Sequence, residues 1–126
     1  MAISSILLTS DLMLSSQAQG AALRAARTLE IDSTPAQLIA RLTAPPFLAA
    51  AGEYRVAIDL ATPGLDIAAI VRQLRALPIP PHAILAFGPH VQAVRLAEAR
   101  AAGCDQVLTR GQFHAQLESI LREQSG

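Results

Sequence analysis

The sequence predicts an α/β fold in which a parallel sheet is covered by helices on both faces. Short apolar runs bounded by turn residues alternate with longer segments of helical periodicity, in units of ~25 residues. One of these runs, residues 55–60, contains Val56-Ala57-Ile58 without any polar alternation. Runs of this kind are typical of strands buried on both faces, as in parallel sheets with right-handed crossovers.

The first two strand-and-helix units carry recognisable start signals. We expect strand 3–9, helix 14–27, strand 29–31 and helix 34–42. Thr34 is a good N-cap, Pro35 suits the first helical position, and Gln37 stands where a capping box requires a glutamine. These three residues predict the start of the second helix.

The segment 44–54 is irregular, because it is apolar yet contains two adjacent prolines. One interpretation is a loop with a short helix that folds back on the core of its own domain. The other is an exposed patch that presents Phe47 and Leu48 to a partner. The sequence leaves both open, and we favour the first.

Three further units complete the chain. We expect strand 55–60, helix 66–77, strand 83–87, helix 88–102, strand 106–109 and a last helix through residues 113–121. The first of these helices has an apolar stripe at the 3.6-residue period, formed by Ile67, Ile70, Val71, Leu74 and Leu77. Pro78 should end it, and Gly103 stands where the C-terminal cap of the next helix belongs.

Composition sets limits on the class of protein. The chain has 126 residues, 52% of them hydrophobic, a formal net charge of zero and a single cysteine. This length fits one domain, residues 1–126, with a full core. A zero net charge without a basic cluster argues against nucleic-acid binding, and no segment is long and apolar enough to cross a membrane. One cysteine and a poor signal-peptide pattern favour the cytoplasm.

Asp59 follows the buried run at the expected carboxyl end of a central strand. Open α/β sheets place their binding crevices at this edge. Pro63-Gly64 is a turn signal, and Asp66 is a good N-cap for the next helix. The sequence therefore predicts a carboxylate in a crevice.

Three stretches in this order resemble the receiver domain of two-component response regulators. Residues 59–66, Asp-Leu-Ala-Thr-Pro-Gly-Leu-Asp, resemble the phosphoacceptor strand and the loop after it. Residues 103–110 are similar to the stretch with the family's lysine, and residues 6–11 to the first strand and its acidic pair. The resemblance covers nearly the whole chain. It implies a flavodoxin-like, five-stranded parallel sheet of order 2-1-3-4-5 with helices on both faces.

The resemblance also implies a chemistry, which is phosphoryl transfer from a phosphohistidine to Asp59. Asp11 would be the metal-contacting acid of the pair, and Ala61 would offer its backbone carbonyl, so that Asp11, Asp59 and Ala61 would hold Mg²⁺. A lysine and a hydroxyl from the end of the fourth strand would stabilise the charge on the phosphoryl oxygens.

Several positions depart from the family pattern. Ser10 replaces the first acid, so Mg²⁺ affinity should fall. The fourth strand ends in Phe87, or Gly88 if the register slips by one, and neither has a hydroxyl. Phe87 would also crowd the phosphoryl pocket. Arg110 stands in place of lysine, and Val107 in place of the aromatic switch residue. The resemblance therefore predicts a degenerate receiver with a degraded phosphorylation site.

Three functional hypotheses follow. The first is a pseudo-receiver, a protein-interaction module without enzymatic activity. The second is an atypical response regulator that is slowly phosphorylated on Asp59 with Mg²⁺. The third is a flavin-type binder in which a loop with Thr9, Ser10, Ser15 and Ser16 cradles a phosphate. This loop lacks a glycine-rich turn, so we place the third hypothesis last.

The expected partners are an unknown protein, such as a histidine kinase or an output protein, or a second copy in a homodimer. The docking face would combine the helix at 88–102, the strand at 106–109 and the last helix. Candidate contacts are Arg95, Glu98, Arg100 and Asp105, although an ordinary solvated surface is the simpler interpretation. Cys104 suits a small buried side chain. The three histidines show no metal-ligand spacing, and residues 124–126 suit a linker in a longer protein.

Overall fold

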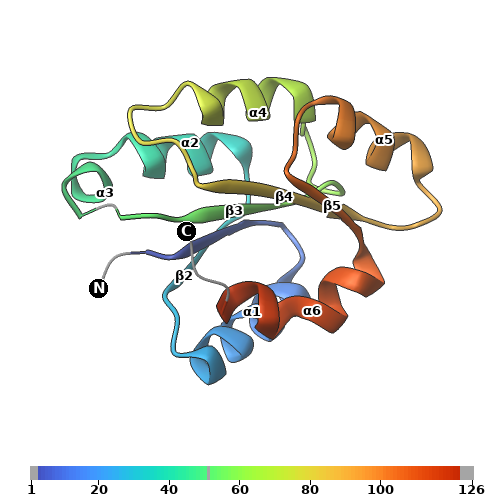
Figure 1. Ribbon diagram of the computed structural model, residues 1–126, viewed down its shortest axis with the longest axis horizontal. Coiled ribbons are helices and arrows are strands. Elements are labelled where there is room, and N and C mark those ends of the chain that lie inside the picture. The colour runs from blue at the N-terminus through green and yellow to red at the C-terminus, as the bar shows by residue number, and fades with distance from the viewer. Residues whose placement is uncertain (1–2, 51, 123–126) are drawn as a thin grey trace.

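A computed structural model describes residues 3–50 and 52–122 and places them around one parallel sheet (Figure 1). The strand order is β2-β1-β3-β4-β5, which confirms the expected fold class and order. The strands are β1 (Ser5–Leu8), β2 (Leu29–Asp32), β3 (Arg55–Asp59), β4 (Ala83–Gly88) and β5 (Gln106–Thr109). The helices are α1 (Leu12–Ala25), α2 (Pro35–Thr43), α3 (Pro45–Ala50), α4 (Ile67–Arg75), α5 (Ala93–Ala101) and α6 (Arg110–Arg122). In this part of the chain, no helix is both long and apolar enough to span a membrane.

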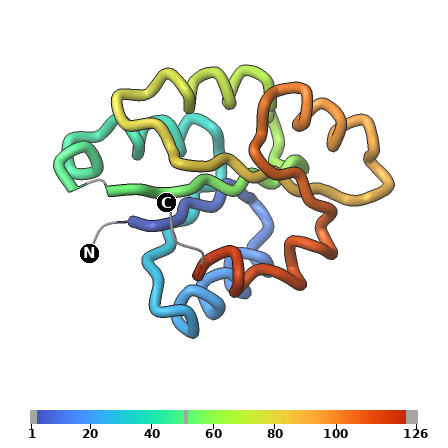
Figure 2. Tube along the Cα trace, in the orientation of Figure 1, coloured from blue at the N-terminus to red at the C-terminus, as the bar shows by residue number. Residues whose placement is uncertain are grey.

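The helices form two layers around the sheet. Helices α2, α4 and α5 lie on the upper face in Figure 1, and α1 and α6 lie together on the lower face. The tube in Figure 2 shows that β1, β3 and β4 run in the same direction and end toward the right of the view. The loops after these strands therefore meet at one edge of the sheet.

Alternation along the strands divides the core between the two faces. Leu7, Leu85 and Phe87 belong to the cluster between the sheet and the helices α1 and α6. Ile6, Val56, Ile58 and their neighbours belong to the cluster under α2 and α4. The central strands β1, β3 and β4 bury side chains on both faces, as the uninterrupted apolar runs predict.

The helix starts follow the predicted caps, with two corrections. The side chains of Thr34 and Asp66 accept hydrogen bonds from the backbone N–H groups of Gln37 and Ala69, respectively. The predicted capping box is wrong, because Gln37 Oε1 accepts hydrogen bonds from the backbone N–H and the hydroxyl of Ser33 and not from the backbone N–H of Thr34. The first helix begins at residue 12 instead of 14, because Asp11 caps it.

The start of α5 is a further correction. We expected a helix directly after Gly88-Pro89, but α5 begins at Ala93. Gly88 still pairs with Thr109 in the sheet, and the Pro89 carbonyl accepts a hydrogen bond from the Gln92 N–H in a turn. Sheet pairing and this turn delay the helix. Gly103 has a φ of +97°, as its predicted role at the end of that helix requires.

The segment after α2 folds back on the core. Its prolines begin the short helix α3, whose Phe47 is buried. The Phe47 ring meets the Tyr54 ring edge-on at 5.0 Å between centroids. Leu48 is partly buried against the same cluster. The first interpretation of residues 44–54 is confirmed, and the exposed-patch alternative is wrong.

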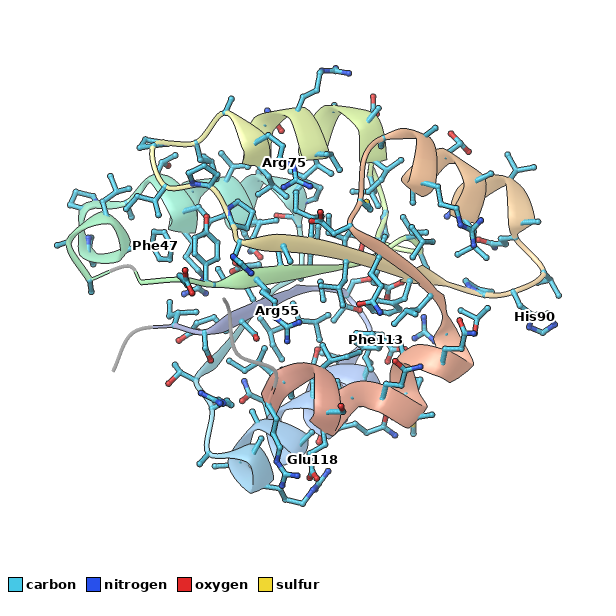
Figure 3. The ribbon with its side chains drawn as sticks, viewed as in Figure 1. Phe47, Arg55, Arg75, His90, Phe113 and Glu118 are labelled. Atoms are coloured by element: carbon cyan, nitrogen blue, oxygen red, sulfur yellow. The ribbon has the colours of Figure 1, made fainter. Side chains whose placement is uncertain are left out.

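Phe113 provides a test of the core under α6. Its ring is 2% exposed and points from α6 toward the sheet (Figure 3), where it stacks on Phe87. Phe113→Ala should lower the free energy of unfolding by ~3–5 kcal/mol, because it leaves a cavity. Urea unfolding followed by circular dichroism measures this change. The exposed neighbour His114→Ala is the control and should stay within ~0.5 kcal/mol of the unmodified chain.

Candidate functional site

Asp59 is the last residue of β3 and is almost fully buried, with 2% of its surface exposed. Its Oδ1 atom accepts a hydrogen bond of 2.9 Å from the backbone N–H of Ala61. Its own carbonyl accepts from the Thr62 hydroxyl at 2.7 Å. The loop after β3 is thus fastened around Asp59, and the carboxylate has a fixed orientation.

Thr9 holds the other oxygen of this carboxylate. Its hydroxyl, buried at the end of β1, donates a hydrogen bond of 2.7 Å to Asp59 Oδ2. The same hydroxyl oxygen accepts from the backbone N–H of Asp11 at 3.1 Å. The sequence suggests Thr9 only as part of a phosphate cradle, and its hydrogen bond to Asp59 is a role that sequence reasoning does not find. Its position at the end of the strand next to β3 was the available signal.

Asp11 lies beside this pair at the N-terminus of α1. Its Oδ1 atom caps the helix by accepting from the backbone N–H groups of Met13 and Leu14. Its Oδ2 atom accepts a hydrogen bond from Nη2 of Arg110. The Leu14 N–H, with help from the Arg110 charge and the Met13 N–H, lowers the pKa of Asp11 below its ordinary value of 3.8, although partial desolvation opposes this shift.

Arg110 connects the two acids. It is the first residue of α6, directly after β5, and it is partly buried. While Nη2 contacts Asp11, Nη1 lies 3.6 Å from Asp59 Oδ1. The Asp11 N–H, the Thr9 hydroxyl, the Asp59 carboxylate, the Arg110 guanidinium and the Asp11 carboxylate therefore form a closed ring. We call these four residues the carboxylate ring.

The carboxylate ring and the neighbouring backbone N–H groups together bind all four carboxylate oxygens of the two acids. Across residues 3–50 and 52–122, no group of three or more His, Cys, Asp or Glu side chains could hold a metal ion. Ala61, the third predicted metal ligand, lies beside Asp59 and contacts it through its N–H.

Phe87 lies next to Asp59 in the sheet. It is the register partner of Asp59 on β4, and its ring is fully buried. The ring stacks on Phe113 with 3.8 Å between centroids and 7° between planes. It therefore contributes to the core below the carboxylate ring. A Cβ atom at the next residue, Gly88, would contact the Leu60 side chain at 3.4 Å. That Phe87 crowds a phosphoryl pocket stays a prediction.

Two of the candidate contact residues have partners within the chain. Arg95 of α5 donates a hydrogen bond of 2.9 Å to the Leu60 carbonyl. Asp105 accepts from the Ile84 N–H at 2.7 Å and from Arg75 of α4, which points toward the sheet (Figure 3). Glu98 and Arg100 are exposed on α5.

The remaining singled-out residues have structural environments. Cys104 packs against the core, and its burial raises the pKa of the thiol to about 11, so it stays protonated near neutral pH. Cys104 is only partly buried, where we expected a small buried side chain. His82, His90 and His114 are all exposed, and His90 projects from the loop before α5 (Figure 3). Residues 124–126 lie outside the described residues.

Comparison with known proteins relates this fold to receiver domains. No family model and no curated protein matches the sequence. The receiver domain of a Pseudomonas aeruginosa sensor histidine kinase, with magnesium in its active-site cleft, superposes with a TM-score of 0.75 at 15% identity and covers 97% of this chain and 96% of its own.

Two more solved structures show the same likeness. A response-regulator receiver domain from Bermanella marisrubri has a TM-score of 0.73 at 19% identity, with 95% of each chain covered. The phosphorylated cyanobacterial phytochrome response regulator RcpA has a TM-score of 0.75 at 12% identity, and the match covers 97% of this chain and 90% of RcpA. The chain has the receiver-domain fold of two-component response regulators. At these identities the likeness shows the fold alone.

Thr9→Val should destabilise the protein by ~1–3 kcal/mol, because the buried Asp59 carboxylate loses a hydrogen-bond donor. Urea unfolding measures the loss. Ser10→Ala, at the exposed neighbouring position, is the control. In an Asp59→Asn background the effect of Thr9→Val should shrink, and an unchanged effect would mean that the hydroxyl does not act through Asp59.

Asp11 should contribute to the acid limit of stability. Because folding lowers its pKa, its contribution is present above the unfolded value of 3.8 and is lost as the pH falls through the folded value. Asp11→Asn should remove this part of the pH dependence, since asparagine can still cap α1 but carries no charge. The urea midpoints of both proteins, measured as a function of pH, test this prediction. An equal loss of stability at low pH in both proteins would contradict it.

Proposed function

We propose that this chain is a receiver-type signalling domain that acts mainly through protein contacts, with a site that is degraded for phosphorylation. The carboxylate ring is the observation that carries the proposal. In it, the acid at the phosphoacceptor position is bound by Thr9 and Ala61 and faces Arg110. Asp59 is also buried, and the groups around it stabilise its negative charge and fix its orientation.

The chemistry of phosphoryl transfer supports this proposal. Asp59 would need an oxygen that the phosphorus atom can approach, yet the residue is 2% exposed. Its surroundings would also need donors aimed at the developing charge on the phosphoryl group. Both of its oxygens already accept hydrogen bonds. Phe87 and Gly88 offer no hydroxyl at the end of β4. The absence of one such donor typically lowers the rate ~100- to 1,000-fold.

The same geometry bears on magnesium. A solved receiver domain of this fold holds magnesium in its cleft. Here the Asp11 and Asp59 carboxylates face a guanidinium, and Ser10 supplies no third acid. As arranged, these residues do not fit a divalent cation, because Arg110 uses the oxygens and the space that a cation would need. We propose that Mg²⁺ binding is weakened and that the domain has no enzymatic activity.

The interaction role is proposed for the face formed by α5, β5 and α6. Val91 and Val94 are 77% and 74% exposed at the start of this face, and Glu98 and Arg100 are exposed further along α5. Exposed apolar residues bordered by charged ones suit a protein contact. The partner would be a histidine kinase, an output protein or a second copy of the chain, and the cytoplasm is the proposed location.

The second candidate is an atypical response regulator that accepts phosphate slowly on Asp59. The observation that favours it is the position of the two acids, which lie side by side at the carboxyl edge of the sheet and share Arg110. An opening of the ring would expose Asp59 Oδ1 to a phosphodonor. This candidate and the first differ in one measurable quantity, which is the mass of the protein after phosphodonor treatment.

Incubation with a small-molecule phosphodonor and magnesium should leave the intact mass unchanged. The reason is that the Asp59 carboxylate is buried and hydrogen-bonded at both oxygens, and that the end of β4 supplies no hydroxyl donor. Asp59→Asn is the matched control, and a phosphorylatable receiver domain confirms that the donor is active. A stoichiometric gain of one phosphoryl group that Asp59→Asn abolishes would overturn the first candidate and establish the second.

A further inference from the structure

We infer that the Arg110 guanidinium is an internal cation that takes the place of a divalent metal ion between Asp11 and Asp59, and that its removal uncovers a divalent-cation site. The inference shares one premise with the proposed function, which is that Asp11 and Asp59 of the unmodified chain do not bind magnesium. It concerns what stabilises the two acids, so it is tested by metal-dependent stability and not by phosphorylation.

The first step concerns the negative charges of the Asp11 and Asp59 carboxylates, which must be compensated. Asp59 is 2% exposed, and Asp11 lies against the same guanidinium. A buried carboxylate without a compensating cation is costly, so Asp59 and the neighbouring Asp11 need a positive charge between them. Arg110 contacts one oxygen of each acid and meets this need within the chain.

The second step is that other arginines are engaged elsewhere. Arg24 pairs with Glu118, Arg41 with Asp32, and Arg75 with Asp105. Arg95 donates to the Leu60 carbonyl. Arg110, in contrast, forms ion pairs with both Asp11 and Asp59.

The third step is competition for the same oxygens. Hard divalent cations bind carboxylate oxygens, and Asp11 Oδ2 and Asp59 Oδ1 are the oxygens that face Arg110. The planar guanidinium can contact both at once through separate nitrogens, which a compact ammonium does less well. While Arg110 is in place, a divalent cation would have to displace it. Without Arg110, the two acids repel each other and attract a divalent cation.

The experiment compares melting temperatures of the unmodified chain and Arg110→Gln in magnesium, in manganese and in sodium chloride of matched ionic strength. The unmodified chain should melt at the same temperature in all three. Arg110→Gln should melt lower by several degrees in sodium chloride and regain ~4 °C or more in the divalent salts, since a ligand that binds the folded state stabilises it.

Two controls test whether the response of the melting temperature to divalent cations arises at Asp11 and Asp59. Arg122→Gln removes an exposed arginine at the other end of α6 and should show no divalent response. Arg110→Gln combined with Asp59→Asn should lose the response, because one of the two acids is gone. Arg110→Lys keeps the charge and should show a smaller divalent response than Arg110→Gln, which keeps the test available if Arg110→Gln does not fold.

The outcomes separate this inference from the proposed function. Stabilisation of the unmodified chain by magnesium beyond the sodium chloride value would overturn it, as would folded Arg110 variants with no divalent response. A phosphoryl adduct on Asp59 would overturn the proposed function. That result would leave the inference standing if melting of the unmodified chain stayed independent of divalent cations.

Discussion

The carboxylate of Asp59 is buried at the end of β3, and the structure around it follows from the cost of placing a charge there. Desolvation of an ion is offset only by hydrogen bonds and an opposite charge in good geometry. Those groups come from three other segments: the hydroxyl of Thr9 after β1, the N–H of Ala61 in the loop after β3, and the guanidinium of Arg110 at the start of α6. One buried charge thereby fixes the relative positions of β1, β3 and α6.

Asp11 shows how sheet topology makes this possible. Strands β1 and β3 are adjacent and parallel, so the residues after them meet at the same edge. Asp11 uses one oxygen to cap α1 and the other to bind Arg110, and the two contacts do not compete. An anion at a helix N-terminus is also favoured by the helix dipole. The helix cap and the ion pair therefore stabilise the same orientation of this side chain.

The fold and the position of Asp59 follow from local patterns in the sequence, whereas Asp11 and Arg110 were singled out through the resemblance to receiver domains. Apolar runs located the strands, caps located α2 and α4, and residues at strand ends had to converge on one edge. The hydrogen bond from Thr9 to Asp59 joins residues 50 positions apart and depends on the direction of one hydroxyl. The stacking of Phe87 on Phe113 depends on how α6 packs on the sheet. Neither follows from local pattern, and the delayed start of α5 reflects sheet pairing that competes with helix signals.

The presence of both acids favours phosphorylation as a function, but the carboxylate ring gives a structural reason for the same two residues. Removal of Asp59 alone would leave Thr9 without its acceptor and Arg110 with one partner fewer. Removal of Arg110 alone would leave a buried carboxylate without its cation. Each single change opens an unsatisfied group, so the members of the ring depend on one another. A phosphoacceptor-like aspartate can therefore be required by the structure even where it accepts no phosphate, and its presence in a receiver fold does not by itself indicate phosphoryl transfer.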